Sequence, residues 1–350
     1  MNQVTSNLQI RPLTGEDNAR WDTFVLSHEN ATFFHRAGWS EVIRSTFGHD
    51  TYFVYAERDG DIIGILSLVH NKSRLFGNRL VSTSFCVHGG PLTIAPEANT
   101  ALDAYAEDLA EKLDVDFLEY RSAEATKPDW QCQSDLYYVF RREISDDADA
   151  NLKAIPRKQR AVVRKAIKAE QLSVEIDDGP DRFYKVYSIS VRNLGSPVFS
   201  KRYCQNLKRV FGDDCEFLIL VGPNGEAVSG VLQFYFRDEV LPYYGGGTPD
   251  ARKFGAHDYM YWQSMCRAAE RGVRIFDFGR SKANTGAFSF KKNWGFEPQP
   301  LYYEYKLKPG HSLPDTNTLN PKYQIMINCW KRLPLPIANT IGPHLVSALG

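Results

Sequence analysis

The chain has 350 residues, of which 43% are hydrophobic and 13% aromatic, and its 42 lysines and arginines balance 42 aspartates and glutamates. This composition excludes a globally disordered chain, and the zero net charge argues against a dedicated nucleic-acid-binding protein. The six cysteines form no CxxC pair, and no histidine stands at metal-ligand spacing, so we expect reduced thiols and no metal site. The polar N-terminus and the lack of an apolar run of about 18–20 residues predict a soluble, cytoplasmic protein.

Residues 1–145 read as one α/β unit. The stretch YFVYAERDGDIIGILSLV predicts a hairpin, because Asp59 and Gly60 stand as turn residues between alternating apolar residues. A further strand, a pair of glycines in HGGPL and a helix over residues 97–113 follow. The unit then runs into the strand VDFLEYRS, which ends in Arg121 and Ser122.

Residues 146–170 predict a basic linker helix. Arg157, Arg160, Arg164 and Lys168 are three or four residues apart and share one helical face. One interpretation is a solvated face on a connecting helix. The other is an anion-binding face for a diphosphate or for RNA, since one guanidinium group can donate two parallel hydrogen bonds to phosphate oxygens.

Residues 171–308 repeat the order of the first unit. The stretch EFLILVGPNGEAVSGVLQFYF predicts a hairpin with its turn at Asn224 and Gly225. A strand, the glycines of YYGGGTPD, a helix over residues 255–271 and the strand RIFDFGRS follow. This strand also ends in an Arg-Ser pair, Arg280 and Ser281. The repeated order with the same ending predicts a duplication, and hence two α/β domains.

Residues 309–350 form a proline-containing tail. Pro334, Pro336 and Pro343 exclude one straight helix. We expect the tail to pack on the second domain. The alternative is a peripheral contact with the inner membrane through Trp330, Lys331 and Arg332.

The sequence lacks the GxSxG, GxxxxGK[ST] and HExxH motifs, which argues against hydrolase, kinase and metalloenzyme chemistry of those kinds. The stretch GGGTPDARKFGAHD places glycines at a helix start, where backbone N–H groups and the helix dipole favour an anion. Arg252 and Lys253 add positive charge there. This arrangement suits the pyrophosphate of an acyl carrier such as coenzyme A.

The order of elements resembles the GNAT acyltransferase fold, and the duplication resembles the FemAB-type aminoacyltransferases. The segments that carry this resemblance are FFHRAGW, AERDGDIIGILSLV, PRKQRAVVRKAIKAEQLSV and FDFGRSKANTGAFSFKKNWGF. The segments GSPVFSKRYCQNLKRVFGDD, YYGGG and NCWKRLPLPIANTIGP resemble more closely the FemAB-related proteins of the PEP-CTERM/exosortase system, found in exopolysaccharide-producing Gram-negative bacteria. The resemblance implies an α/β (α+β) fold with two tandem GNAT-like domains, each a mixed, mainly antiparallel sheet flanked by helices.

The same resemblance implies N-acyl or aminoacyl transfer to an amine of a cell-envelope or exopolysaccharide precursor, which is a small or lipid-linked molecule. It also implies acyl-CoA or aminoacyl-tRNA as the donor substrate, and we expect no tightly bound cofactor. Arg252 and Gly255 fit the GNAT pyrophosphate loop, but His257 stands where that loop has a small residue. Two other functions remain open: a catalytically silent assembly factor that binds the precursor, and an RNA-binding role for the basic helix.

The candidate site centres on the aromatic and lysine cluster after RIFDFGRS. The resemblance places Phe290 and Lys291 near the acyl ester. Neighbouring aromatic rings would desolvate Lys291 and Lys292 and strengthen their attraction for an oxyanion or a phosphate. Alternatively, the aromatics are core and the lysines reach out to solvent.

Asp277 is the candidate general base or orienting carboxylate, or else a cap for the following loop. Arg280 either binds an anion or ties the loop to Asp277. The remaining candidates bind the acceptor: Tyr243 and Tyr244 by their hydroxyl groups, and His35, Arg36 and Trp39 by resemblance.

Overall fold

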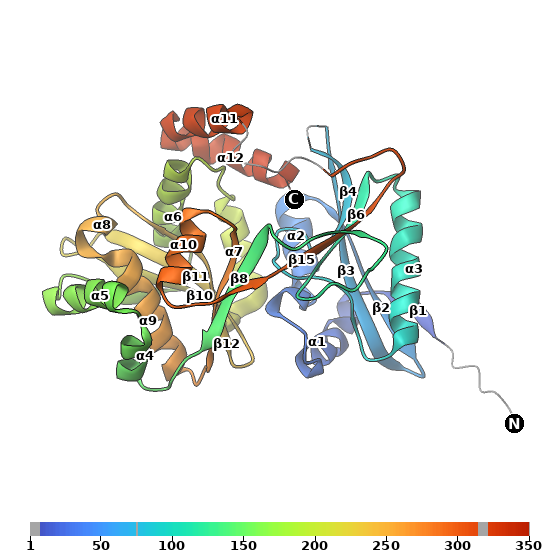
Figure 1. Ribbon diagram of the computed structural model, residues 1–350, viewed down its shortest axis with the longest axis horizontal. Helices are drawn as coiled ribbons and strands as arrows, with labels where there is room; N and C mark the ends of the chain where they lie inside the picture. The colour runs from blue at the N-terminus through green and yellow to red at the C-terminus, as the bar shows by residue number, and fades with distance from the viewer. Residues whose placement is uncertain (1–7, 75, 314–320, 350) are drawn as a thin grey trace, which may run out of the picture. The chain divides into compact units, whose positions relative to one another are not determined.

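The computed structural model describes residues 8–74, 76–313 and 321–349, which fold as two compact units (Figure 1). The first unit comprises residues 1–135, 301–315 and 347–350, and the second comprises residues 136–300 and 316–346. Each unit holds one mixed, mainly antiparallel sheet flanked by helices. The predicted fold class is therefore confirmed.

The sheet of the first unit has the order β1-β2-β3-β4-β6-β15-β7, with β5 pairing β3. Only β4 and β6 run parallel. The predicted turn at Asp59 and Gly60 joins β2 to β3. The strands are β1 (Gln9–Pro12), β2 (Asp50–Arg58), β3 (Asp61–Ser73), β4 (Gly77–Ser82), β5 (Leu92–Thr93), β6 (Phe117–Ser122), β7 (Gln131–Gln133) and β15 (Tyr302–Leu307).

The helices of the first unit follow the apolar periodicity of the sequence. In α3, Ala98, Leu102 and Ala106 lie four residues apart and are fully buried against the sheet, where they meet Leu66 and Leu118 in one core. The helices are η1 (Gly15–Asp17), α1 (Asn18–Ser27), η2 (Phe33–His35), α2 (Gly38–Phe47) and α3 (Pro96–Lys112).

The sheet of the second unit has the order β14-β8-β13-β12-β11-β10-β9, and only β12 and β13 run parallel. The parallel pair stands at the same place in the repeat as β4 and β6 do in the first unit. The strands are β8 (Tyr137–Glu143), β9 (Ser173–Asp177), β10 (Cys215–Val221), β11 (Ala227–Phe236), β12 (Glu239–Gly247), β13 (Ile275–Lys282) and β14 (Pro298–Pro300).

The basic segment 146–170 forms two helices rather than one linker helix. They are separated at Ile155 and Pro156, since a proline disfavours helical geometry in the residue before it. Both belong to the second unit and pack against α9. The helices of this unit are α4 (Ala148–Ala154), α5 (Arg157–Ala169), α6 (Asp181–Leu194), α7 (Lys201–Phe211), η3 (Gly212–Asp214), α8 (Ala251–Phe254), α9 (Ala256–Glu270) and α10 (Gly286–Asn293).

The tail forms helices α11 (Pro321–Arg332) and α12 (Leu335–Leu349). Ile327 of α11 lies against Gly195, and Gly342 of α12 lies against Val198, so both helices rest on the segment that follows α6. None of the helices in the described residues has the length and apolar character that crossing a bilayer requires.

The two halves exchange one strand each. Residues 137–143, which form β8, fall within the predicted domain 1–145, yet β8 pairs with β13 in the second sheet. Residues 302–307, which form β15, fall within the predicted domain 171–308, yet β15 lies between β6 and β7 in the first sheet. Its fully buried Glu304 accepts hydrogen bonds from the backbone N–H groups of Thr126 (2.8 Å) and Lys127 (2.6 Å). The boundaries predicted at 145 and 308 therefore differ from those of the structure, because alternating residues identify a strand without identifying its partner.

Candidate functional site

Strands β12 and β13 pair at only two positions, Glu239 with Ile275 and Val240 with Phe276. Beyond this point both strands are irregular. Tyr243 is an extra residue in β12 relative to β11, and β13 shifts its register against β8 between Asp277 and Arg280. Bulges of this kind re-aim side chains.

Gly279 lies inside the irregular part of β13, with a φ of +66° that favours glycine. A Cβ atom at Gly279 would lie 3.7 Å from Cδ2 of Tyr243. The ring of Tyr243 therefore lies beside the Gly279 backbone, at the point where the two parallel strands cease to pair.

Lys291 comes from α10, the helix that follows β13. The hydroxyl of Thr285 caps this helix by accepting a hydrogen bond from the N–H of Phe288 (3.3 Å). The side chain of Lys291 is buried, with the residue 8% exposed, and its Nζ donates to the carbonyl oxygens of Gly279 (2.9 Å) and Arg280 (3.2 Å). The ammonium group thus satisfies two carbonyls from the irregular part of β13.

Burial lowers the pKa of Lys291 to about 7, the negative charge of Asp277 opposes the shift, and the positive charge of Arg280 adds to it. Near neutral pH the side chain is therefore divided between its charged and neutral forms. Buried groups with strongly shifted pKa values are frequent among catalytic residues.

Two carboxyl groups, those of Asp277 and Glu239, lie near Lys291. Burial raises the pKa of Asp277, although its Oδ1 accepts a hydrogen bond from the N–H of Gly279 (2.6 Å). Burial and the charge of Asp277 raise the pKa of Glu239 to about 7. The two side chains are hydrogen-bonded to each other, and Nη2 of Arg141 lies 2.8 Å from Oε2 of Glu239. The pair therefore binds a proton more readily than two separate, exposed carboxylates would.

The other predicted residues of this region have aromatic neighbours. The half-buried Phe290 packs on Tyr261 and Trp294, at centroid distances of 5.6 Å and 5.9 Å. The guanidinium of Arg280 lies 4.5 Å from the ring centroid of Tyr137. Lys292, next to Lys291 in sequence, is exposed, so the two lysines occupy opposite environments.

Tyr243 and Tyr244 belong to an aromatic cluster on β12, α6 and α7. The hydroxyl of Tyr244 lies 3.3 Å from that of Tyr203, and the ring centroids of Tyr243 and Tyr244 are 4.6 Å apart. Tyr187 and Phe199 complete the cluster. The structure thus places the predicted Asp277, Arg280, Phe290 and Lys291 together, with Tyr243 beside them.

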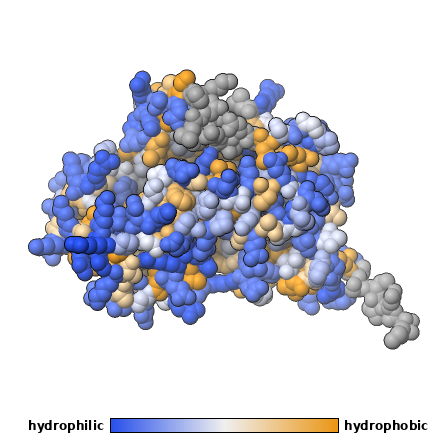
Figure 2. Space-filling model, in the orientation of Figure 1, coloured by the Kyte–Doolittle hydropathy of each residue, from blue (hydrophilic) through white to orange (hydrophobic). Residues whose placement is uncertain are grey.

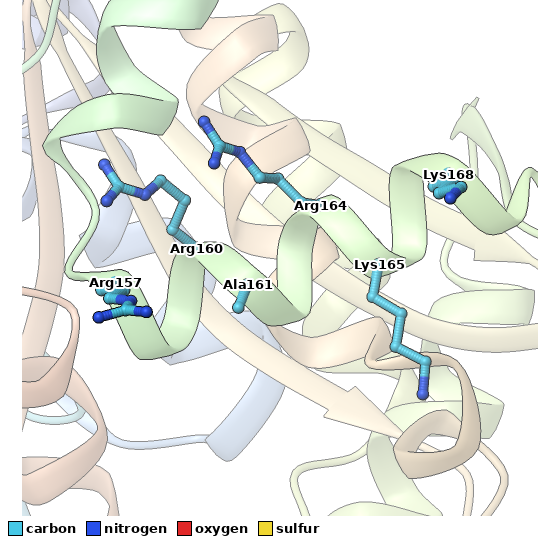
Figure 3. Close-up of a pocket in the computed structure, with 6 residues that line it drawn as sticks. All are labelled: Arg157, Arg160, Ala161, Arg164, Lys165 and Lys168. Carbon is cyan, nitrogen blue, oxygen red and sulfur yellow. The ribbon is translucent and has the colours of Figure 1, made fainter.

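The basic residues of α5 form a separate surface in the same unit. A shallow hollow of about 490 Å³ is lined by Arg157, Arg160, Ala161, Arg164, Lys165 and Lys168. Figure 3 shows the side chains of Arg160 and Arg164 extending on one side of the helix. The start of this helix adjoins the end of α10, since a Cβ atom at Gly295 would lie 3.1 Å from Cγ of Pro156.

Helix α5 also explains Gly255. This residue ends α8 with a φ of +63°, and a Cβ atom there would lie 2.8 Å from Cγ1 of Val162. The glycine is therefore required by the backbone conformation and by the close approach of α5. Arg252 is exposed on α8. The packing of α5 therefore explains the glycine at position 255, and a bound pyrophosphate is not needed to explain it.

The three candidates from the first unit have structural partners there. His35 is buried, its Nε2 lies 3.2 Å from the carbonyl oxygen of Gly90, and burial and His88 lower its pKa to about 3. Nε1 of the fully buried Trp39 donates to the carbonyl of Phe33 (3.1 Å). Arg36 forms an ion pair with Asp22 (3.4 Å). Their role in acceptor binding stays a prediction.

Sequence reasoning missed Glu239 and Arg141. Glu239 directly follows the turn between β11 and β12, where an acidic residue looks like ordinary turn chemistry. Arg141 lies on β8, together with Phe140, whose ring centroid is 5.5 Å from Nζ of Lys291. Arg141 and Phe140 both fall within the predicted domain 1–145, so no local pattern links them to the candidate site of the second domain. Among the residues that the structure describes, no His, Cys, Asp and Glu side chains gather in a way that could hold a metal ion.

Comparison with known proteins matches residues 157–292 to the family model of an acetyltransferase (GNAT) domain. Over 90 residues the chain is 31% identical to the lipid II:glycine glycyltransferase of Staphylococcus haemolyticus (strain JCSC1435). That match covers 24% of this chain and 22% of the relative, so the chain spans about a fifth of the length of the curated protein it matches.

Three solved structures have a similar fold over most of the chain. FemX aligns over 91% of this chain and 100% of its own, at 17% identity and a TM-score of 0.66. L-PGS from Bacillus licheniformis aligns over 93% and 99%, at 14% identity and a TM-score of 0.56. A tandem GNAT protein from the clavulanic acid biosynthesis pathway aligns over 86% and 98%, at 12% identity and a TM-score of 0.54. The chain therefore has a tandem GNAT fold similar to that of FemX, and residues 157–292 of its second unit match the model of a GNAT acetyltransferase domain.

Proposed function

We propose that this protein transfers an aminoacyl group from an aminoacyl-tRNA to an amine of a cell-envelope precursor. The observation that carries the proposal is the environment of Lys291. Its Nζ is held by two backbone carbonyls beside the pair Asp277 and Glu239. A buried, partly charged lysine fixed in this way is suited to a reaction in which an oxyanion develops.

The reaction joins the acceptor nitrogen to the carbonyl carbon of the aminoacyl ester. The carbonyl oxygen becomes an oxyanion in the tetrahedral intermediate. Two of the three N–H bonds of a protonated Lys291 go to Gly279 and Arg280, which leaves one for that oxygen. When the ester C–O bond breaks, its electron pair goes to the ribose oxygen of the tRNA, which takes the proton that the amine loses. Asp277 orients Lys291 and holds the β13 backbone through Gly279.

Two observations favour tRNA over coenzyme A as the donor. Helix α5 carries five basic side chains that line the hollow, and we call them the cationic face of α5: Arg157, Arg160, Arg164, Lys165 and Lys168. The start of α5 adjoins the end of α10. Such a row of basic side chains suits the phosphodiester backbone of RNA. Gly255, the expected pyrophosphate residue, is instead explained by Val162. The family model is nevertheless that of an acetyltransferase, so acyl-CoA is the donor to test against.

The acceptor is an amine on a peptidoglycan or exopolysaccharide precursor. The name of the staphylococcal relative indicates that lipid II is the substrate of that protein. The resemblance to proteins of the PEP-CTERM/exosortase system adds exopolysaccharide precursors to the class.

The test offers both donors to the purified full-length chain. Total tRNA charged with labelled amino acids, or acetyl-CoA and longer acyl-CoAs, is incubated with lipid II or with lipid extracts, and products are identified by mass spectrometry. We expect transfer from charged tRNA that ribonuclease abolishes. Transfer from acyl-CoA alone would overturn the donor. Binding of the precursor without any product from either donor would overturn the proposed activity and favour a precursor-binding assembly factor.

A further inference from the structure

The helices α11 and α12 expose apolar side chains. Ten large hydrophobic residues are exposed among the residues that the structure describes, and five of them lie on or beside these helices within the second unit. Ile325, which is 65% exposed, and Met326 lie on α11, while Ile337 and Ile341, which is 44% exposed, lie on α12. Leu194 ends α6, next to the glycine that Ile327 contacts. We call these five residues the apolar face.

The apolar face is not the packing face of either helix. Ile327 of α11 lies against Gly195, while Ala338 and Gly342 of α12 are buried. Ile337 and Ile341 are four residues apart, so they lie on one side of α12, and both are exposed. A helix on the surface of a protein ordinarily carries charged and polar residues there. Figure 2 shows hydrophobic residues on the surface in this part of the second unit, the part that Figure 1 labels α11.

The charge of the tail is one-sided. From residue 316 to residue 350 the sequence contains no aspartate or glutamate, although the chain has 42 of them. The same stretch contains Lys322, Lys331 and Arg332. Lys331 and Arg332 are exposed at the end of α11, directly beyond the apolar side chains of that helix. The surface that offers apolar contacts is therefore bordered by positive charge without a compensating negative charge of its own.

We propose that the apolar face docks on the surface of an anionic phospholipid bilayer. Its isoleucine, leucine and methionine side chains enter the boundary between headgroups and acyl chains, and Lys331 and Arg332 bind lipid phosphates. Helices of 12 and 15 residues that lie along the interface satisfy this arrangement without crossing the bilayer.

A second copy of the chain is a less suitable occupant of the same face. In a symmetric dimer the same patch meets itself, which brings the positive charges of two copies together without acidic partners from the tail. An anionic lipid surface supplies the missing negative charge. The proposal goes beyond the proposed transfer reaction, because docking is measured without donor or acceptor.

The experiment measures sedimentation of the full-length chain with vesicles. One set is phosphatidylcholine mixed with phosphatidylglycerol, and the other is phosphatidylcholine alone. We expect binding to the anionic vesicles that is at least about tenfold tighter than to the neutral ones, and that weakens as salt is raised. The double variant Ile325→Ser/Ile341→Ser should lose about tenfold in vesicle affinity.

The matched control replaces exposed apolar residues elsewhere in the second unit. Val174 and Ile176 lie on the outer strand β9, where Ile176 is 43% exposed, close to the value of Ile341. The double variant Val174→Ser/Ile176→Ser should bind vesicles as the unaltered chain does. A second test variant, Lys331→Glu/Arg332→Glu, changes charge without removing apolar area and should abolish the preference for anionic vesicles.

Three results would overturn the proposal: no binding of the unaltered chain to anionic vesicles, equal loss in the β9 control, or an unchanged lipid preference in the charge variant. Concentration-dependent dimerisation that disappears with Ile325→Ser/Ile341→Ser, in the absence of vesicle binding, would instead assign the face to a second copy of the chain.

Discussion

The Nζ of Lys291 lies 2.9 Å from the carbonyl oxygen of Gly279, twelve residues earlier in the chain. This contact ties α10 to the irregular part of β13, so one side chain both fixes the backbone of the site and brings an amine group to it. The carbonyls that hold Lys291 also limit its freedom, which fits a group that must be in place before the substrate arrives.

Replacing Lys291 by methionine keeps the length of the side chain and removes the charge and the N–H donors. We expect kcat to fall by about a hundredfold or more, as for the loss of an oxyanion donor. The neighbouring Lys292→Met is the matched control, because Lys292 is exposed, and it should remain near the activity of the unaltered chain. Kinetics with saturating donor, together with thermal unfolding of both variants, make the comparison. Equal activity in the two variants would exclude the proposed role.

The substitution Glu239→Gln should change how stability depends on pH. The pKa of Glu239 is raised from 4.5 to about 7 in the folded chain. The contribution of the protonated Glu239 side chain to folding stability is therefore fully present below pH 4.5 and is lost as the pH rises through about 7. Glutamine does not titrate, so the variant lacks this pH dependence. The free energy of unfolding of the unaltered chain should therefore fall relative to that of the variant as the pH rises from 5 to 8. The change in this difference should be on the order of 2 kcal/mol. Denaturant unfolding at several pH values measures this difference, and a constant offset would contradict it.

The cationic face of α5 should determine how tRNA binding depends on salt. Arg164→Glu removes one phosphate contact, so the slope of log affinity against log salt should fall by about one, with weaker binding to all tRNA species. Lys158→Glu is the matched control on the same helix, because Lys158 does not line the hollow. Filter binding across a salt series gives both slopes. A similar change in both variants would mean that only the net charge of the chain matters.

The contact between Gly255 and Val162 predicts a coupled effect on stability. Gly255→Ala adds a Cβ atom to a residue with positive φ and directs it at the Val162 side chain, so we expect a loss of about 1–3 kcal/mol. In a Val162→Ala background the steric part of this loss should disappear, which leaves a coupling of about 0.5 kcal/mol or more. Urea unfolding of the two single variants and the double variant completes the cycle. Strict additivity would show that the two residues do not meet.

The sequence predicts many of the helices and strands of the two units. The helix predicted over residues 97–113 is α3 (Pro96–Lys112), and that predicted over residues 255–271 is α9 (Ala256–Glu270). Local periodicity and turn residues determine such elements. They do not determine which strand lies next to which, because pairing depends on contacts far apart in the sequence.

The same limit explains what was missed in the site. Lys291 and Asp277 come from one continuous motif, so they were found together. Arg141 and Phe140 reach the site on β8, more than a hundred residues earlier, and no local pattern connects them with Lys291. Glu239 differs from ordinary turn residues only through its burial beside Asp277, which is a property of the folded chain.

The position of β15 between β6 and β7 has a consequence for biosynthesis. When a ribosome has released residues 1–135, the first sheet still lacks an inner strand, and the backbone of Thr126 and Lys127 has no Glu304 to bind. Translation at ordinary rates delays that strand by roughly ten to thirty seconds. The sheet whose synthesis begins first is therefore completed after the other sheet, and a nascent chain stalled before residue 302 would display an unpaired strand edge to chaperones.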